Sequence, residues 1–185
     1  FDFASIGVQV EVFDLAASTL LPSRLMALRR RLKVLSPDLI HGWMYHGSVV
    51  SALLAPDRVP LVWGIHHSLH DFSAESLSIR SLVRTGAILS RMSRTKALLY
   101  CSNVSMNHHR DYGYPQSKAV LLPNGFDGAE FAPAPSLREN VRASLGFEAS
   151  SVVVGSFGRY HPVKDHSLLL HAFARSAVRF KCARL

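Results

Sequence analysis

The segment from Gly155 to Asp165 contains residue types that bind phosphate. Gly158 stands beside Arg159, and Lys164 follows a few residues later. The segment lies between an apolar run and a helical pattern, and ligands of open α/β sheets bind at the carboxyl ends of strands. Helix N-termini favour anions, arginine can fork onto phosphate oxygens and lysine supplies a point charge. We therefore predict that Gly158, Arg159 and Lys164 bind a diphosphate, although a solvated loop whose cations pair with surface acids has the same pattern.

A second group of reactive side chains follows the apolar run Leu61 to Ile65. His66 and His67 come directly after this run, and His70 stands nearby. Strand exits place catalytic groups in α/β proteins, so His66 and His67 are the candidate catalytic residues. Imidazole is also the commonest metal ligand, which leaves a metal-dependent hydrolase built on the three histidines as an alternative. We predict no metal site, because the spacing matches no dense ligand motif such as HExxH. A further interpretation is that these histidines lie on the surface or pack against other side chains and have no catalytic role.

Two more pairs stand where strands are expected to end. His41 and Gly42 precede a helix, and we predict that they line the cleft or acceptor side, while packing at a helix start explains them equally. Asn124 and Gly125 predict a turn with positive φ. We also place this pair beside the cleft, where a glycine allows a substrate to approach the backbone.

The elements that must position these residues alternate between short apolar runs and longer helical patterns. This alternation predicts an α/β fold with a doubly wound, Rossmann-like parallel sheet. The expected strands are 8–13, 39–42, 61–65, 97–101, 119–122 and 152–157. Helices are expected at 21–35, around 79–89, 137–145 and 165–180.

Turn and linker residues gather between Pro123 and Pro135, which predicts a domain boundary. We expect an N-terminal domain at 1–133 and a second unit at 134–185 that supplies just a β-α opening. The chain begins at Phe1 without Met. We therefore expect a fragment that lacks the first strand of one domain and most of the other.

Composition limits the class of protein and its partners. Hydrophobic residues make up 48% and charged residues 18%, which excludes a disordered chain. The net charge of +8 favours an anionic partner such as a nucleotide, a nucleic acid or a lipid surface. The helices expected at 21–35 and around 79–89 are rich in Arg and Lys. The basic side of each helix is either a solvated face or a peripheral contact with an anionic membrane. Cys101 and Cys182 lack CxxC spacing, which favours a reducing, cytoplasmic location.

Two other classes lack their signatures. No GxGxxG follows a strand, which argues against a dinucleotide oxidoreductase. No basic patch with interleaved aromatic residues is evident, so we predict no nucleic-acid partner. A non-catalytic basic binding domain stays open as an alternative.

Four motifs in order resemble the retaining glycosyltransferases of family 4. They lie at 63–69, 100–114, 122–133 and 158–166. The resemblance implies a two-domain GT-B enzyme, with 1–133 on the acceptor side and 134–185 opening the donor domain. It implies that one of His66 and His67 faces the acceptor and that Arg159 and Lys164 stabilise the departing diphosphate.

The resemblance also implies the reaction and its partners. A nucleotide-sugar donor would give its sugar to a saccharide or lipid-linked acceptor, with retention, in cell-surface polysaccharide or lipopolysaccharide biosynthesis. GT-B enzymes generally need no metal, so no cofactor is expected. The chain alone is expected to be inactive, because catalysis in a two-domain cleft needs both walls.

Overall fold

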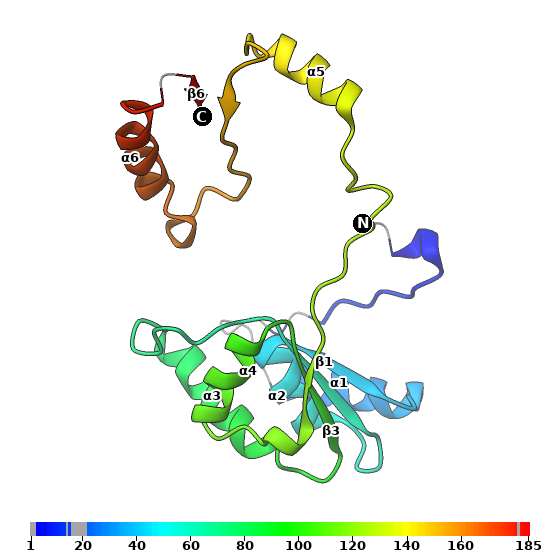
Figure 1. Cartoon of the computed structure of the whole chain (residues 1–185). Coiled ribbons are helices and arrows are strands. Elements are labelled where there is room, and N and C mark those ends of the chain that lie inside the picture. The colour runs from blue at the N-terminus through cyan, green and yellow to red at the C-terminus, as the bar shows by residue number, and fades with distance from the viewer. Residues whose placement is uncertain (1–2, 14, 16–21, 181) are drawn as a thin grey trace. The chain divides into compact units, whose positions relative to one another are not determined.

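The computed structural model describes residues 3–13, 15, 22–180 and 182–185 (Figure 1). The chain divides into two compact units, Phe1–Gly125 (unit 1) and Phe126–Leu185 (unit 2). This division lies inside the segment from Pro123 to Pro135 and earlier than the predicted boundary after residue 133. The assignment of the units to acceptor and donor stays a prediction.

Unit 1 is built on a parallel sheet in which the strands follow one another in sequence order. Its strands are β1 (Ile40–Trp43), β2 (Leu61–Ile65), β3 (Thr95–Tyr100) and β4 (Ala119–Leu121). The connections are α2 (Met44–Leu54), α3 (Leu77–Leu89) and α4 (Asn103–Asp111). Right-handed crossovers that advance in one direction place all three helices on the same face. This arrangement confirms the predicted α/β, Rossmann-like class.

The core of unit 1 lies between that face of the sheet and the three helices. Trp63 and Ile65 of β2 and Leu98 and Tyr100 of β3 are completely buried, or nearly so. Alternate residues of a strand share a face, which explains why each strand contributes such a pair. The helices contribute smaller residues to the same cluster: Ala52, Ala55, Val83 and Ala87.

Basic side chains hold the C-terminal ends of two of these helices. Arg94 donates to the carbonyl oxygens of Ala52 and Ala55 at the end of α2. The Lys118 ammonium lies 2.9 Å from the carbonyl oxygen of Ser90, just after α3. Carbonyls at helix C-termini lack helical partners, so these cations satisfy groups that would otherwise be unpaired.

One predicted strand is wrong. Residues 8–13 form no strand in the described chain, and the side chain of Val12 is 88% exposed. Alternating apolar residues make a strand only where a neighbour completes the hydrogen-bond ladder, and no described strand pairs with this segment. Glu11 instead forms an ion pair with Arg31 of α1 (Pro22–Leu35), the helix predicted at 21–35.

Unit 2 has few strands and little burial. Its elements are α5 (Pro135–Ser144), β5 (Val152–Val153), α6 (His166–Ala177) and β6 (Ala183–Arg184). β5 is shorter than the predicted strand at 152–157, because the parallel strand β6, which the sequence did not suggest, is just two residues long. Arg142 of α5 donates to the carbonyl oxygens of Glu148 and Ser151, both at 2.7 Å, and so fixes the turn before β5.

Candidate functional site

The strand register brings several polar side chains to one edge of the unit 1 sheet. Trp43 of β1 pairs with Gly64 of β2, and Ile65 pairs with Tyr100 of β3, so these three strands end together. The residues that follow the strands therefore converge. Met44, directly after β1, has a left-handed backbone with φ 58°, a conformation that costs a non-glycine residue on the order of 1–3 kcal/mol.

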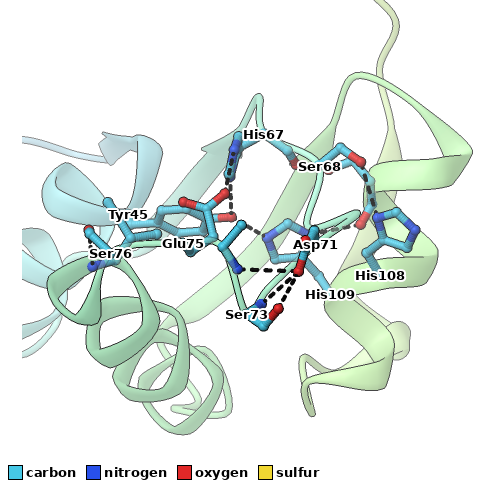
Figure 2. Close-up of polar contacts among 12 residues, drawn as sticks. Tyr45, His67, Ser68, Asp71, Ser73, Glu75, Ser76, His108 and His109 are labelled. Carbon is cyan, nitrogen blue, oxygen red and sulfur yellow. Dashed lines mark hydrogen bonds and ion pairs between the residues drawn. The ribbon is translucent and has the colours of Figure 1, made fainter. Parts of the chain in front are cut away.

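A continuous hydrogen-bond chain crosses this edge (Figure 2). The Tyr45 hydroxyl, at the start of α2, lies 3.2 Å from His67 Nδ1 and 2.8 Å from His109 Nε2. His109 Nδ1 lies 2.8 Å from the carbonyl oxygen of Ser105, one turn earlier on α4. At the other end, His67 Nε2 lies 3.3 Å from Glu75 Oε1. The chain thus joins α2, the loop after β2 and α4.

Burial sets the charge of the inner members of this chain. His109 is completely inaccessible to solvent, and burial lowers its pKa to about 4 because the charged form loses its hydration. The neighbouring His67 and His108 lower that pKa further. Burial raises the pKa of the Tyr45 hydroxyl, so this group stays a neutral phenol. Both residues are therefore uncharged at neutral pH.

The loop that carries His67 is held in place by further contacts. The Ser105 hydroxyl donates to the carbonyl oxygen of His67 at 2.5 Å. The Ser68 hydroxyl lies 3.0 Å from His108 Nδ1 on α4. An Asp71 carboxylate oxygen accepts from the backbone nitrogen of Ser73 at 3.0 Å (Figure 2). The first two bonds tie the loop to α4, and the third fixes a turn within the loop.

His66 points to different neighbours from those of His67. Its ring stacks on the indole of Trp43, with centroids 4.2 Å apart and planes at 20°. The His41 ring also lies beside this indole, with ring centroids 5.4 Å apart. A Cβ at Gly64 would collide with the His41 ring, so the glycine leaves room for it. The indole is 58% exposed. His66, His41 and Trp43 therefore form an accessible aromatic group beside the hydrogen-bond chain.

The histidine cluster does not surround one point. His67 contacts Tyr45 and Glu75, His66 contacts Trp43, and His70 lies against His108 with ring centroids 6.4 Å apart. Among the described residues, no group of three or more His, Cys, Asp or Glu side chains could hold a metal ion. The geometry therefore gives the metal-dependent hydrolase alternative no support.

The structure shows the local packing of the predicted cleft glycines, and their place beside a cleft stays a prediction. Gly42 is buried, and a Cβ there would lie 2.7 Å from the Cα atom of Ser48, so this glycine allows β1 to pack on α2. The prediction of a positive-φ turn at Asn124 and Gly125 is wrong, since Gly125 has no left-handed φ and both residues are exposed. The turn forms later, where the Asp127 carboxylate accepts from the backbone nitrogen of Ala129 at 2.8 Å.

In unit 2 the structure brings Lys164 to Gly158. The lysine stem lies 3.7 Å from the place of a Cβ at Gly158, beside Arg159. Both cations are exposed, and neither forms a salt bridge within the described part of the chain. The Asp165 carboxylate caps α6 by accepting from the backbone nitrogen of Leu168 at 3.1 Å. Because Asp165 already occupies the N-terminus of α6, the positive charge that this loop offers to a ligand comes from the side chains of Arg159 and Lys164.

Tyr45, His109 and Glu75, which contact His67 directly or through one another, were not among the site residues predicted from the sequence. His109 stands in the motif at 100–114, but no role was assigned to it, and each of the three comes from a different connection between strands. The weak signal for His109 is its place four residues after Ser105 on a short helix, where a buried imidazole can bond to the preceding turn. Their meeting depends on strand register.

No helix in the described residues is both long enough and apolar enough to pass through a membrane. The predicted peripheral contact with an anionic membrane is a separate matter and stays a prediction.

Comparisons with known proteins give a family match, a curated relative and structures with a similar fold. Residues 5–130 match the family described as Glycosyltransferase Family 4. The D-inositol 3-phosphate glycosyltransferase of Kineococcus radiotolerans is 44% identical over 143 residues, which cover 74% of this chain and 32% of that protein. Crystal structures of Anabaena HepE with UDP and with UDP-glucose have TM-scores of 0.76 and 0.75, at 24% and 25% identity. They cover 94% of this chain, which spans 46% of HepE.

Proposed function

Because the chain belongs to glycosyltransferase family 4, we propose that it is part of an enzyme that transfers a sugar from a nucleoside diphosphate donor. The acceptor in this proposal is a saccharide or a lipid-linked molecule, and the anomeric configuration is retained. The HepE structures support the donor class, and the Kineococcus relative supports the transferase class. Anabaena HepE was crystallised with UDP and with UDP-glucose, and the Kineococcus relative is named a glycosyltransferase.

One observation carries the donor side of the proposal. Arg159 and Lys164 are exposed cations beside a glycine, and no described acid neutralises either one. The surface-loop alternative requires such acids. In the proposal the two side chains bind the diphosphate and stabilise its charge as it leaves, so no resident metal or cofactor is needed for that task.

Unit 1 has the acceptor side in this proposal. His67 and the accessible group of His41, Trp43 and His66 stand at the carboxyl edge of the sheet, where α/β proteins bind ligands. The proposed location is cytoplasmic, with peripheral contact between the basic helices and an anionic membrane. Cell-surface polysaccharide or lipopolysaccharide is the proposed product class.

The chain spans about a third of the Kineococcus protein and about half of HepE. We propose that these 185 residues alone have no appreciable turnover. In unit 2, Phe157 is 99% exposed and the sheet has two short strands, too little to hold a base and a sugar in one geometry. Robust multiple turnover with a panel of nucleotide sugars and acceptors would contradict this.

Calorimetric titration of the full-length enzyme with UDP tests the donor site. Arg159→Ala and Lys164→Ala should each weaken binding by about 1.5–3 kcal/mol, the range for hydrogen bonds to charged groups. The matched control is Arg175→Ala, which removes the same charge from the last turn of α6. Equal affinities in all three variants would remove the diphosphate role.

A further inference from the structure

The donor and acceptor roles in the hydrogen-bond chain of unit 1 follow from the contacts of the buried His109. The carbonyl oxygen of Ser105 can only accept, so His109 Nδ1 must donate to it across their 2.8 Å contact. His109 is completely buried and its pKa is about 4, so its imidazole is neutral and carries one N–H. His109 Nε2 is therefore an acceptor.

The role of Tyr45 follows from the acceptor role of His109 Nε2. The Tyr45 hydroxyl, 2.8 Å from His109 Nε2, must donate its single hydrogen to that nitrogen. Toward His67 the phenol oxygen can then only accept. Since Tyr45 lies 3.2 Å from His67 Nδ1, this ring nitrogen must carry a hydrogen.

The outer nitrogen of the same ring faces another acceptor. Glu75 Oε1 lies 3.3 Å from His67 Nε2, and an ionised carboxylate has no hydrogen to give. Both nitrogens of His67 thus face acceptors. Imidazolium is the one form of histidine with two N–H groups, so the contacts on both sides are satisfied together by that form.

We infer that Tyr45, His109 and Glu75 are positioning residues that hold His67 as a doubly protonated hydrogen-bond donor. The inference rests on the proposed function for its consequence. His67 would donate a charged Nε2–H to an oxygen of the acceptor, and would not act as a general base. His66, which stacks on Trp43, takes no part in the chain.

The outer end of the chain is open to such a ligand. The side chains of His67 and Glu75 are 36% and 25% exposed, whereas His109 is inaccessible. The titratable groups around the His67 ring come from three places: Tyr45 on α2, Glu75 before α3, and His108 and His109 on α4. A substrate oxygen can therefore reach Nε2 and share it with Glu75, while Nδ1 stays fixed by Tyr45.

Nitrogen NMR of the labelled chain at pH 7 tests the inference without any substrate. We expect both ring nitrogens of His67 to give imidazolium shifts and His109 to give those of a neutral ring protonated at Nδ1. In Tyr45→Phe, His67 should lose the imidazolium signal, because Nδ1 loses its acceptor. Glu75→Gln should also remove the imidazolium signal of His67. Because Glu75 is partly exposed, this substitution leaves the core intact.

Tyr100→Phe is the matched control. Tyr100 is buried next to His109, but its hydroxyl has no partner among the described residues, so His67 should keep its signal. A neutral His67 in the unmodified chain would overturn the inference, as would equal effects of Tyr45→Phe and Tyr100→Phe. Failure of UDP to bind would count against the proposed function and would leave the His67 spectrum unchanged.

Discussion

Units 1 and 2 are built from the same β-α pattern but differ greatly in burial. In unit 1, β2 and β3 have a neighbour on both sides, and Trp63, Leu98 and Tyr100 are almost completely inaccessible. In the described part of unit 2, Ser151 is the one buried residue, and Phe157 is fully exposed. A strand buries its apolar residues only where neighbouring strands and helices cover it. We expect unit 1 to hold most of the folding energy and unit 2 to open readily.

Removing one aromatic side chain from each unit gives the largest expected difference. Trp63→Ala should destabilise the chain by about 3–5 kcal/mol, because it leaves a cavity in the core of unit 1. Phe157→Ala should change the free energy of unfolding by less than about 0.5 kcal/mol, the range for exposed positions. Urea unfolding followed by circular dichroism measures both. Similar losses would show that unit 2 has a core of its own.

The buried imidazole of unit 1 should make its stability depend on pH. The pKa of His109 is about 4 in the folded chain, below the ordinary histidine value of about 6.5, so the unfolded chain binds a proton first. The stability that depends on a neutral His109 is fully present above pH 6.5 and is lost as the pH falls toward 4. The loss should be on the order of 2–4 kcal/mol.

The control for that pH dependence is His109→Gln. This variant should be less stable at neutral pH, but its stability should fall less between pH 6.5 and 4, as measured by urea unfolding at several pH values. The difference between the two curves isolates His109 from the other histidines. Parallel curves would mean that His109 does not resist protonation in the folded chain.

Replacing glycine by alanine at two positions should change the stability by a smaller amount, and the sign of the change at Gly86 tests the packing of Tyr114. Alanine usually stabilises a helix interior, but a Cβ at Gly86 would collide with the Tyr114 hydroxyl, which donates to the carbonyl oxygen of Val83. Gly86→Ala should therefore destabilise the chain by about 1–3 kcal/mol. Gly125→Ala should be close to neutral, because no atom lies within 4 Å of the added Cβ. Thermal unfolding decides, and a stabilised Gly86→Ala would contradict the packing described.

Sequence reasoning found the features that depend on local pattern. The apolar run at 61–65 and the strand exit at His66 and His67 could be read directly, since a buried strand needs continuous apolar residues. The strand predicted at 8–13 failed because pairing is not a local property. The chain from Glu75 to His109 could not be predicted, because it depends on the register that aligns β1, β2 and β3.

The segment from Gly155 to Asp165 contains one feature that the sequence predicted and one that it did not. Glycine, arginine and lysine predicted a phosphate site from their types, but the place of the Lys164 stem against Gly158 comes from the turn at Pro162–Lys164. The capping of α6 by Asp165 was not foreseen, although aspartate is a favoured residue at helix starts.

In the proposed function, unit 2 binds the diphosphate of the donor. An NMR titration of the labelled chain with UDP, with uridine as the control that lacks phosphates, tests it most directly. We expect UDP to shift the backbone amides from Gly155 to Leu168, and uridine to produce smaller changes there. In Arg159→Ala and Lys164→Ala these shifts should need more UDP. Equal responses to UDP and uridine, or changes confined to unit 1, would contradict it.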